Sequence, residues 1–241
     1  MDDTKHKAAV DFAARLLESP AGPSVGRILL FGSVAQDRAR LDSDVDVMVF
    51  SAMPFREIQE YTAQAAWEAS VEWGEQVAQL TYSLSDLFQP RSYLLYSAIN
   101  QGQEIYTMNE VDLRRMEADG LCRKADRYLD QAKHAFDRGD YELAIVGAYT
   151  AAELVAKALV FMKSDTELPT THGGMLQIFS REYIRTGQVP EQWGRALNRG
   201  LESRSRALYD TSWIMDVPDT QPVIELADEM LSFLEQRLAD S

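Results

Sequence analysis

The sequence predicts an α+β fold in which a small mixed sheet with flanking helices is followed by an all-α antiparallel helical bundle. Two observations lead to this prediction. Short apolar runs rich in β-branched residues alternate with helical patterns in the first half, whereas after about residue 109 only helical periodicity remains. The chain has 241 residues, 46% of them hydrophobic, which suffices for two small cores. We therefore expect two domains, residues 1–108 and residues 109–241.

The elements of the first half follow from apolar spacing and from residues that break regular structure. Apolar residues at helical spacing predict a helix over about 4–18, and two prolines in 20–23 end it. Runs of apolar and β-branched residues predict three strands. The expected elements after the first helix are a strand over 25–31, a polar turn or short helix over 34–41, a strand over 45–50, a helix over about 54–69 and a strand over 77–83.

The second half shows only helical patterns. Helices are expected over 111–138 and 141–163, with Gly139 and Asp140 between them, and over about 172–186, 191–213 and 221–239. The helix over 141–163 carries one continuous apolar stripe that is rich in alanine and includes Tyr149. This stripe suits either the core of the bundle or a homodimer contact through the helical domain. Short connections between the helices favour an antiparallel bundle.

Charge and composition narrow the classes of function. The net charge is -14 and both halves are acidic, so extensive nucleic-acid binding is not expected. Cys122 is the only cysteine, which excludes an intramolecular disulfide. The first residues lack the apolar centre of a signal peptide, and no uninterrupted apolar run approaches the ~20 residues that span a bilayer. We expect a cytoplasmic protein that does not contact membranes.

The chemically informative stretch is Gly32-Ser33, then ten residues, then Asp44-Val45-Asp46. Alternate residues of a strand point to the same face, so both carboxylates should project together from the start of the second strand. Hard divalent cations prefer such oxygen ligands together with phosphate oxygens. Two ions held there would assist an in-line displacement at phosphorus.

Gly32 and Ser33 fit the same chemistry. Gly32 would let the backbone approach a phosphate closely, and Ser33 adds a hydroxyl group. Each piece alone has an ordinary structural interpretation, because Gly-Ser is common in turns and the segment 42–44 could be a polar loop before a strand. Their combination, strand, Gly-Ser, ten residues, Asp-x-Asp and strand, favours a nucleotide site.

This pattern resembles the signature of the polymerase-β nucleotidyltransferase superfamily, in particular its minimal nucleotidyltransferases. The resemblance implies that Gly32 and Ser33 contact the nucleotide phosphates. It also implies that Asp44 and Asp46 are the catalytic metal ligands, with Mg²⁺ (or Mn²⁺) as the ion and a nucleoside triphosphate, ATP above all, as the substrate.

Active members of that superfamily usually add a third carboxylate from a later strand. At the corresponding place the strand over 77–83 offers Gln79, whose neutral amide is a poorer magnesium ligand and cannot act as a base. Glu75 is the nearest carboxylate before that strand and is the alternative third position; its other interpretation is a solvated charge.

The second half carries four motifs in a fixed order, at residues 124–129, 139–144, 148–159 and 204–209. With them, residues from about 123 to 213 resemble a HEPN domain. Many HEPN proteins cleave RNA with an arginine followed four to six residues later by histidine, but Arg204 is followed by no histidine, so ribonuclease activity is not expected. Arg204 falls on an apolar stripe, where a charge needs a partner. Two interpretations stay open: an ion pair with Glu153, or a ligand pocket formed by Arg204, Glu153 and Tyr209. His172 recurs in this pattern without an assignable role.

Two functions follow from these residues. The first is metal-dependent transfer of a nucleoside monophosphate from a nucleoside triphosphate to an acceptor hydroxyl, on a small molecule or on a protein tyrosine. The second is a catalytically weakened nucleotide-binding or regulatory module of the toxin–antitoxin type, because the third carboxylate and the HEPN histidine are both missing from their expected places.

Overall fold

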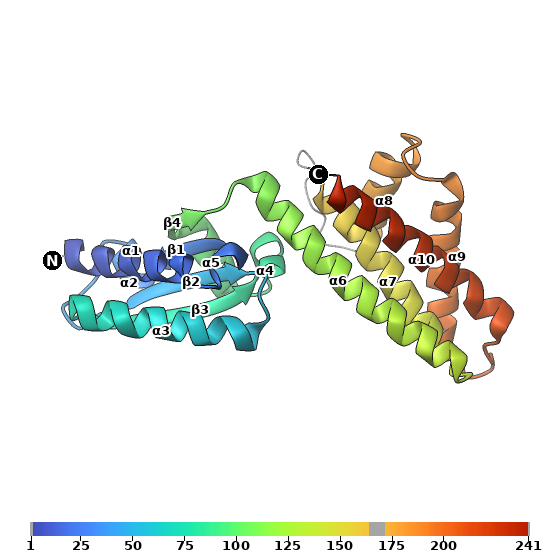
Figure 1. Ribbon diagram of the computed structural model, residues 1–241, viewed down its shortest axis with the longest axis horizontal. Coiled ribbons are helices and arrows are strands. Elements are labelled where there is room, and N and C mark those ends of the chain that lie inside the picture. Colours follow the sequence, from blue (N-terminus) through green and yellow to red (C-terminus); the bar gives the residue numbers. More distant parts are fainter. Residues whose placement is uncertain (1, 164–171, 241) are drawn as a thin grey trace. The chain divides into compact units, whose positions relative to one another are not determined.

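A computed structural model, which describes residues 2–163 and 172–240, confirms the α+β fold (Figure 1). The chain divides into two compact units, Met1–Met116 and Glu117–Ser241. The border lies inside helix α6 (Glu110–Asp137) rather than between residues 108 and 109, where we expected it.

Unit 1 contains a four-stranded mixed sheet in the order β3-β2-β1-β4. The central strand β1 is antiparallel to β2 and to β4, whereas β2 and β3 are parallel. The parallel pair begins at the same end of the sheet, so the loops before β2 and β3 lie next to each other. The strands are β1 (Val25–Phe31), β2 (Val45–Ser51), β3 (Val77–Ser83) and β4 (Gln103–Thr107).

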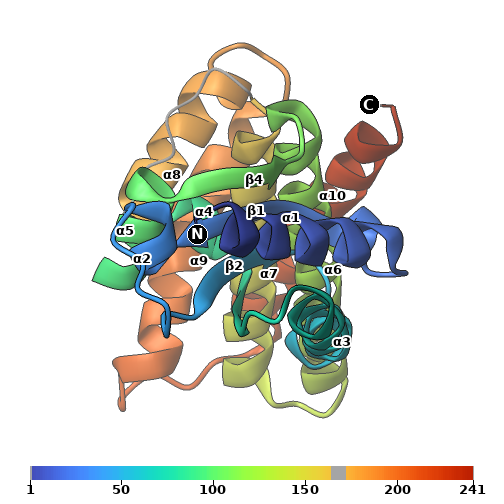
Figure 2. The same cartoon turned by 90° about the vertical axis from the view of Figure 1, so that its left-hand side faces the viewer.

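Each face of this sheet has its own core. Alternation along β2 sends Val47 and Val49 to the face covered by α1 (Asp2–Glu18) and α3 (Phe55–Trp73), which pack side by side (Figure 1, Figure 2). Met48 and Phe50 point to the opposite face and pack with the cluster that includes side chains of the short helices α4 (Leu84–Phe88) and α5 (Tyr93–Gln101). The same alternation determines the face of the sheet on which each remaining side chain of β2 lies.

The elements α4, α5 and β4 were not expected from the sequence. Each is short, and each depends on tertiary contacts more than on local periodicity. The hydroxyl of Ser92 accepts a hydrogen bond from the backbone N–H of Leu95 and caps α5. β4 has five residues and is held by pairing with β1 and by an ion pair between Arg27 and Glu104 of 2.7 Å.

Unit 2 consists of helices, as expected. Its helix α7 (Tyr141–Phe161) packs against α6, where Gly147 faces Ala132, and against α8 (His172–Phe179), α9 (Glu191–Tyr209) and α10 (Val217–Ala239). A π-helical turn, Ser180–Ile184, follows α8. The helix expected over about 221–239 begins earlier, at Val217, and Pro218 fits its first turn because proline has no N–H that needs an intrahelical partner there. The carboxylate of Asp216 caps this start by accepting from the N–H of Asp219.

Helix α7 is the core of unit 2. Among the described residues it is the one helix long and apolar enough to cross a membrane, but most of it is buried within the chain's own fold. Ala148, Tyr149 and Ala152 are fully buried. The alanine-rich stripe is therefore part of the hydrophobic core of unit 2, and Tyr149 is not accessible to a second copy of the chain.

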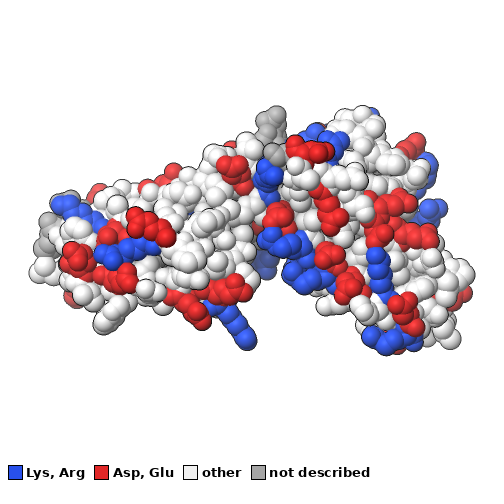
Figure 3. All heavy atoms as spheres, viewed as in Figure 1, with Lys and Arg blue, Asp and Glu red and all other residues white. Residues whose placement is uncertain are grey.

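On the visible face of each unit, acidic and basic side chains are interspersed (Figure 3). Several basic groups are paired with acids of the same unit. Arg15 of α1, for example, contacts Asp11 at 2.8 Å and Glu68 of α3 at 3.1 Å. Such pairing reduces the positive charge available to a phosphate backbone.

Candidate functional site

The turn after β1 brings Gly32 against the carboxylate of Asp46. Gly32 opens the one-turn helix α2 (Gly32–Ala35) with a φ of +73°, a left-handed value that favours glycine. Phe31 and Asp46 are direct partners in the pairing of β1 with β2. A Cβ atom on Gly32 would lie 2.3 Å from Oδ2 of Asp46. The carboxylate thus occupies the space that a side chain at position 32 would need, and it points toward the glycine-serine bend.

Asp44 and Asp46 come from the start of β2. Asp46 has the same parity as Met48 and Phe50 and therefore lies on the sheet face of α4 and α5. Asp44 immediately precedes the strand and is exposed, whereas Asp46 is half-buried. The negative charge of Asp44 acts on Asp46, so the two carboxylates are electrostatic neighbours. The structure brings together Gly32, Asp44 and Asp46, and Ser33 follows Gly32 in α2.

The electrostatics of this pair suit a divalent cation. The pKa of Asp46 is raised, first by burial and then by the charge of Asp44. A cation between the carboxylates would relieve both effects, and oxygen ligands are those that Mg²⁺ and Mn²⁺ prefer. In residues 2–163 and 172–240, no group of three or more His, Cys, Asp or Glu side chains is arranged to hold a metal. The chain therefore offers two carboxylates, and phosphate oxygens and water would complete the shell.

The raised pKa of Asp46 gives a pH-dependent prediction. Folding favours the protonated carboxyl, so its stabilising contribution is complete below the unfolded pKa and is lost as pH rises through the raised pKa. The wild-type chain should therefore lose stability relative to the variant Asp46→Asn as pH rises, and the two should converge in acid. Urea unfolding of both proteins over about pH 4 to 7 measures the difference in free energy. A difference that does not change with pH contradicts the prediction.

The register between β2 and β3 determines whether Gln79 can supply a third ligand to a metal beside Asp46. Ala78 lies opposite Asp46 and Leu80 lies opposite Met48, so the site face of β3 carries alanine and leucine. Gln79 lies opposite Val47 and reaches the other face, where it lines a groove beside α3. The amide that we considered for the metal shell is therefore on the opposite side of the sheet from Asp46.

Glu75, the other candidate for the third position, forms an ion pair with Lys5 of α1. Sequence reasoning missed Lys5, although one signal was present. Lys5 precedes Ala9, Phe12 and Leu16 at helical spacing, on the buried stripe of α1. It is 2% exposed, and a charge on such a stripe requires specific partners.

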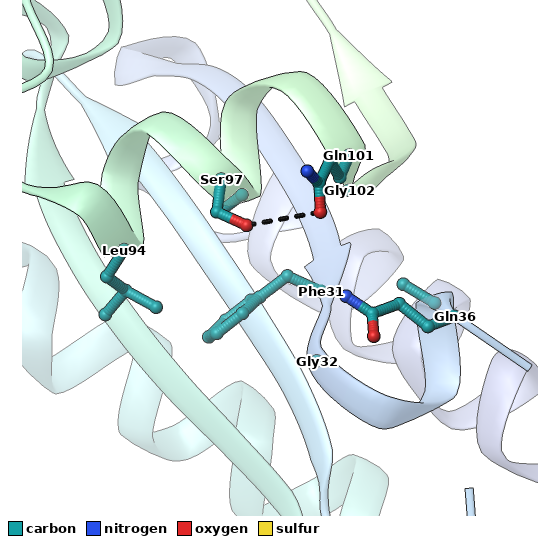
Figure 4. A pocket seen from close by; sticks show the side chains of 9 residues that line it. Phe31, Gly32, Gln36, Leu94, Ser97, Gln101 and Gly102 are labelled. Carbon is teal, nitrogen blue, oxygen red and sulfur yellow. Dashed lines mark hydrogen bonds between the residues drawn. The ribbon is translucent and has the colours of Figure 1, made fainter. Parts of the chain in front are cut away.

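A cavity of about 220 Å³ adjoins the bend (Figure 4). Phe31, Gly32 and Gln36 line one side, and Ser97 and Gln101 of α5 line the other. The hydroxyl of Ser97 donates to Oε1 of Gln101 at 3.4 Å. No residue that lines the cavity carries a charge. The cavity offers room beside Gly32 for an uncharged part of a bound molecule.

The side chains considered for a pocket in unit 2 come from α7 and α9, and Arg204 lies next to Tyr149. The guanidinium carbon of Arg204 lies 5.8 Å from the centre of the Tyr149 ring. Its Nε is buried and, among the described residues, meets no acceptor. Glu153 and Arg204 both act electrostatically on the hydroxyl of Tyr149, whose pKa is raised chiefly by burial. Tyr209 ends α9 and is 80% exposed, so it belongs to the surface.

Cys122 and His172 are two further residues that were noted in the sequence because of their residue types. Burial raises the pKa of Cys122 to about 11, which makes its thiol a poor nucleophile at neutral pH. His172, to which the sequence assigned no role, is the first residue of α8.

Comparisons with known families cover both units. The family described as "Polymerase beta, Nucleotidyltransferase" matches residues 19–111, and the family described as "HEPN domain" matches residues 118–237. The first match contains the bend and both aspartates. The second contains α7, α8, α9 and most of α10.

Three curated relatives match parts of the chain. "Putative toxin MJ0142" of Methanocaldococcus jannaschii is 26% identical over 98 residues, which are 41% of this chain and 65% of the relative. "Putative toxin MJ0605" of the same organism is 31% identical over 97 residues, or 40% of this chain and 71% of the relative. A "UPF0332 protein" of Thermotoga maritima is 29% identical over 124 residues, or 49% and 88%.

The order of the two matches agrees with the architecture, because the sheet and its paired aspartates come first and the helical bundle second. The chain belongs to the polymerase-β nucleotidyltransferases through its first domain and to the HEPN family through its second.

Proposed function

We propose that the first domain binds a nucleoside triphosphate with Mg²⁺ (or Mn²⁺) and transfers its nucleoside monophosphate to an acceptor hydroxyl, on a small molecule or on a protein tyrosine. The observation that carries the proposal is the contact between Gly32 and Asp46, with Asp44 beside it. A nucleotidyltransferase domain in this chain supports it.

The residues have separate tasks in this proposal. Asp44 and Asp46 hold the cation, which when bound would neutralise phosphate charge and align the α-phosphorus for attack. Gly32 lets the bend close onto Asp46, and Ser33 offers a hydroxyl to the phosphates. The acceptor oxygen bonds to the α-phosphorus while the bond to the bridging oxygen breaks, pyrophosphate leaves, and the acceptor proton passes to a base.

A transferase mechanism needs a base that accepts the proton of the acceptor hydroxyl, and the residues considered for the third position do not supply one at this site. The site face of β3 presents Ala78 and Leu80, and Glu75 is engaged by Lys5. This favours a second candidate, a catalytically weakened nucleotide-binding or regulatory module of the toxin–antitoxin type. The names of two relatives as toxins and the lack of a histidine within six residues after Arg204 support the same candidate.

One assay separates the two candidates. The protein is incubated with labelled ATP, GTP, CTP or UTP, magnesium and acceptors of both kinds. Asp44→Ala/Asp46→Ala serves as the inactive variant, and Asp42→Ala, an exposed acid of the same loop, is the matched control. Label incorporation that needs Asp44 and Asp46 but not Asp42 supports the transferase. Magnesium-dependent nucleotide binding without incorporation supports the regulatory module, and calorimetry that shows no such binding contradicts both.

A further inference from the structure

Lys5 joins three segments at the end of the sheet where β2 and β3 begin. Its Nζ donates to the carbonyl of Ser43 at 2.7 Å and, in a longer contact of 3.5 Å, to the carbonyl of Leu41. It also forms the ion pair with Glu75, which lies two residues before β3. One buried ammonium group therefore holds both the loop that leads into Asp44 and the loop that leads into β3.

These contacts fix the backbone immediately before Asp44. Ser43 is its neighbour in the chain, and the next backbone N–H, that of Val45, donates to the carbonyl of Gln76 at 2.8 Å. The side chain of Asp44 itself is exposed. The backbone on either side of it is thus fixed, on one side by Lys5 and on the other by the strand pairing.

Burial of a lysine is energetically unfavourable, so stability alone does not explain why a lysine holds this loop. Removing an ammonium group from water costs free energy that its partners only partly return. An apolar residue at this place on the stripe of α1 would serve the core as well. The retained charge is explained if the loop must be held in one defined conformation.

We propose that Lys5 is a positioning residue, which fixes the loop of Leu41 to Ser43 so that Asp44 stays beside Asp46, and which keeps Glu75 in a structural ion pair instead of the metal shell. This inference rests on the proposed function of the site. It assigns to Lys5 no contact with the nucleotide.

The test compares Lys5→Met with Arg15→Met. Arg15 is the matched control because it also ties α1 to another element, through Glu68 of α3, but does not contact the loop before Asp44. The first measurement is hydrogen exchange of the backbone amides of residues 41–46. The second is the magnesium concentration that half-saturates ATP binding.

In Lys5→Met we expect faster exchange of these amides and a magnesium requirement raised by roughly tenfold or more, because small displacements of a positioned group are costly. Arg15→Met should change neither. Lys5→Arg keeps the cation and should recover part of the effect. Lys5→Gln replaces Lys5→Met if the latter does not fold, and the same direction of change is expected.

Glu75→Gln separates the structural role of Glu75 from metal binding. We expect its magnesium requirement to stay within about twofold of wild type, since no ligand is removed. A large rise in that requirement with unchanged amide exchange would make Glu75 a metal ligand and overturn the proposal. Unchanged exchange and unchanged magnesium requirement in Lys5→Met would also overturn it. If the wild-type chain binds no ATP with magnesium, the proposed function fails, while the exchange measurement still decides whether Lys5 holds the loop.

Discussion

Asparagine in place of Asp46 is expected to lower magnesium-dependent nucleotidyl transfer by roughly 10³-fold or more, while the folded chain becomes more stable at neutral pH. The loss follows because charge stabilisation by a bound metal ion is worth several kcal/mol, and each 1.4 kcal/mol is about a tenfold change in rate. The gain in stability follows because the half-buried carboxylate, beside Asp44, no longer carries a charge. Label incorporation and thermal unfolding measure the two effects.

The matched control for this prediction is Asp42→Asn. Asp42 lies in the same acidic loop but is exposed and precedes the pair. It should leave both the transfer rate and the melting temperature near their wild-type values. If the two variants lose activity equally, the loop acts through its general negative charge, and the assignment of Asp46 as a metal ligand is wrong.

Alanine at position 32 is expected to weaken magnesium-dependent ATP binding by about 100-fold, the second large effect. The left-handed backbone at Gly32 costs an alanine roughly 1–2 kcal/mol. Its Cβ would also lie 2.3 Å from Oδ2 of Asp46, so the carboxylate must leave its position. A displacement of about 1 Å in such a group can cost 100-fold. Calorimetric titration with ATP and magnesium measures the dissociation constant Kd.

Gly74→Ala separates backbone strain from the contact with Asp46. Gly74 has a φ of +66° at the end of α3, close to that of Gly32, and a Cβ placed there meets nothing within 4 Å. Both variants should therefore lose similar stability, but only Gly32→Ala should lose ATP affinity. Equal losses of affinity would show that destabilisation alone, and not the position of Asp46, reduces binding.

The residues of the candidate site were predictable from sequence to the extent that they depend on local geometry. Asp44 and Asp46 were expected to project together because side chains alternate along a strand, and the charge of Asp44 does act on Asp46. The glycine at position 32 follows from the close approach of Asp46, which the pattern of Gly-Ser and Asp-x-Asp implied but could not measure.

The third position could not be predicted in the same way. Whether Gln79 faces the site depends on the register between β2 and β3, and a shift of one residue reverses every side chain of the strand. The ion pair of Glu75 with Lys5 joins residues 70 positions apart in the chain. Arg204 illustrates the same limit, because the contact of its guanidinium with the Tyr149 ring joins two different helices, α9 and α7.

The sequence by itself determined the α+β class, three of the four strands, the helical second half and the pair of acids beside a glycine, since each depends on periodicity or on spacing within a few residues. Only the tertiary structure decided the short edge strand β4, the face to which Gln79 turns and the partner of Glu75. These features depend on which distant segments pair, and the free energy that selects the pairing comes from burial and hydrogen bonding across the sheet, which no local pattern encodes.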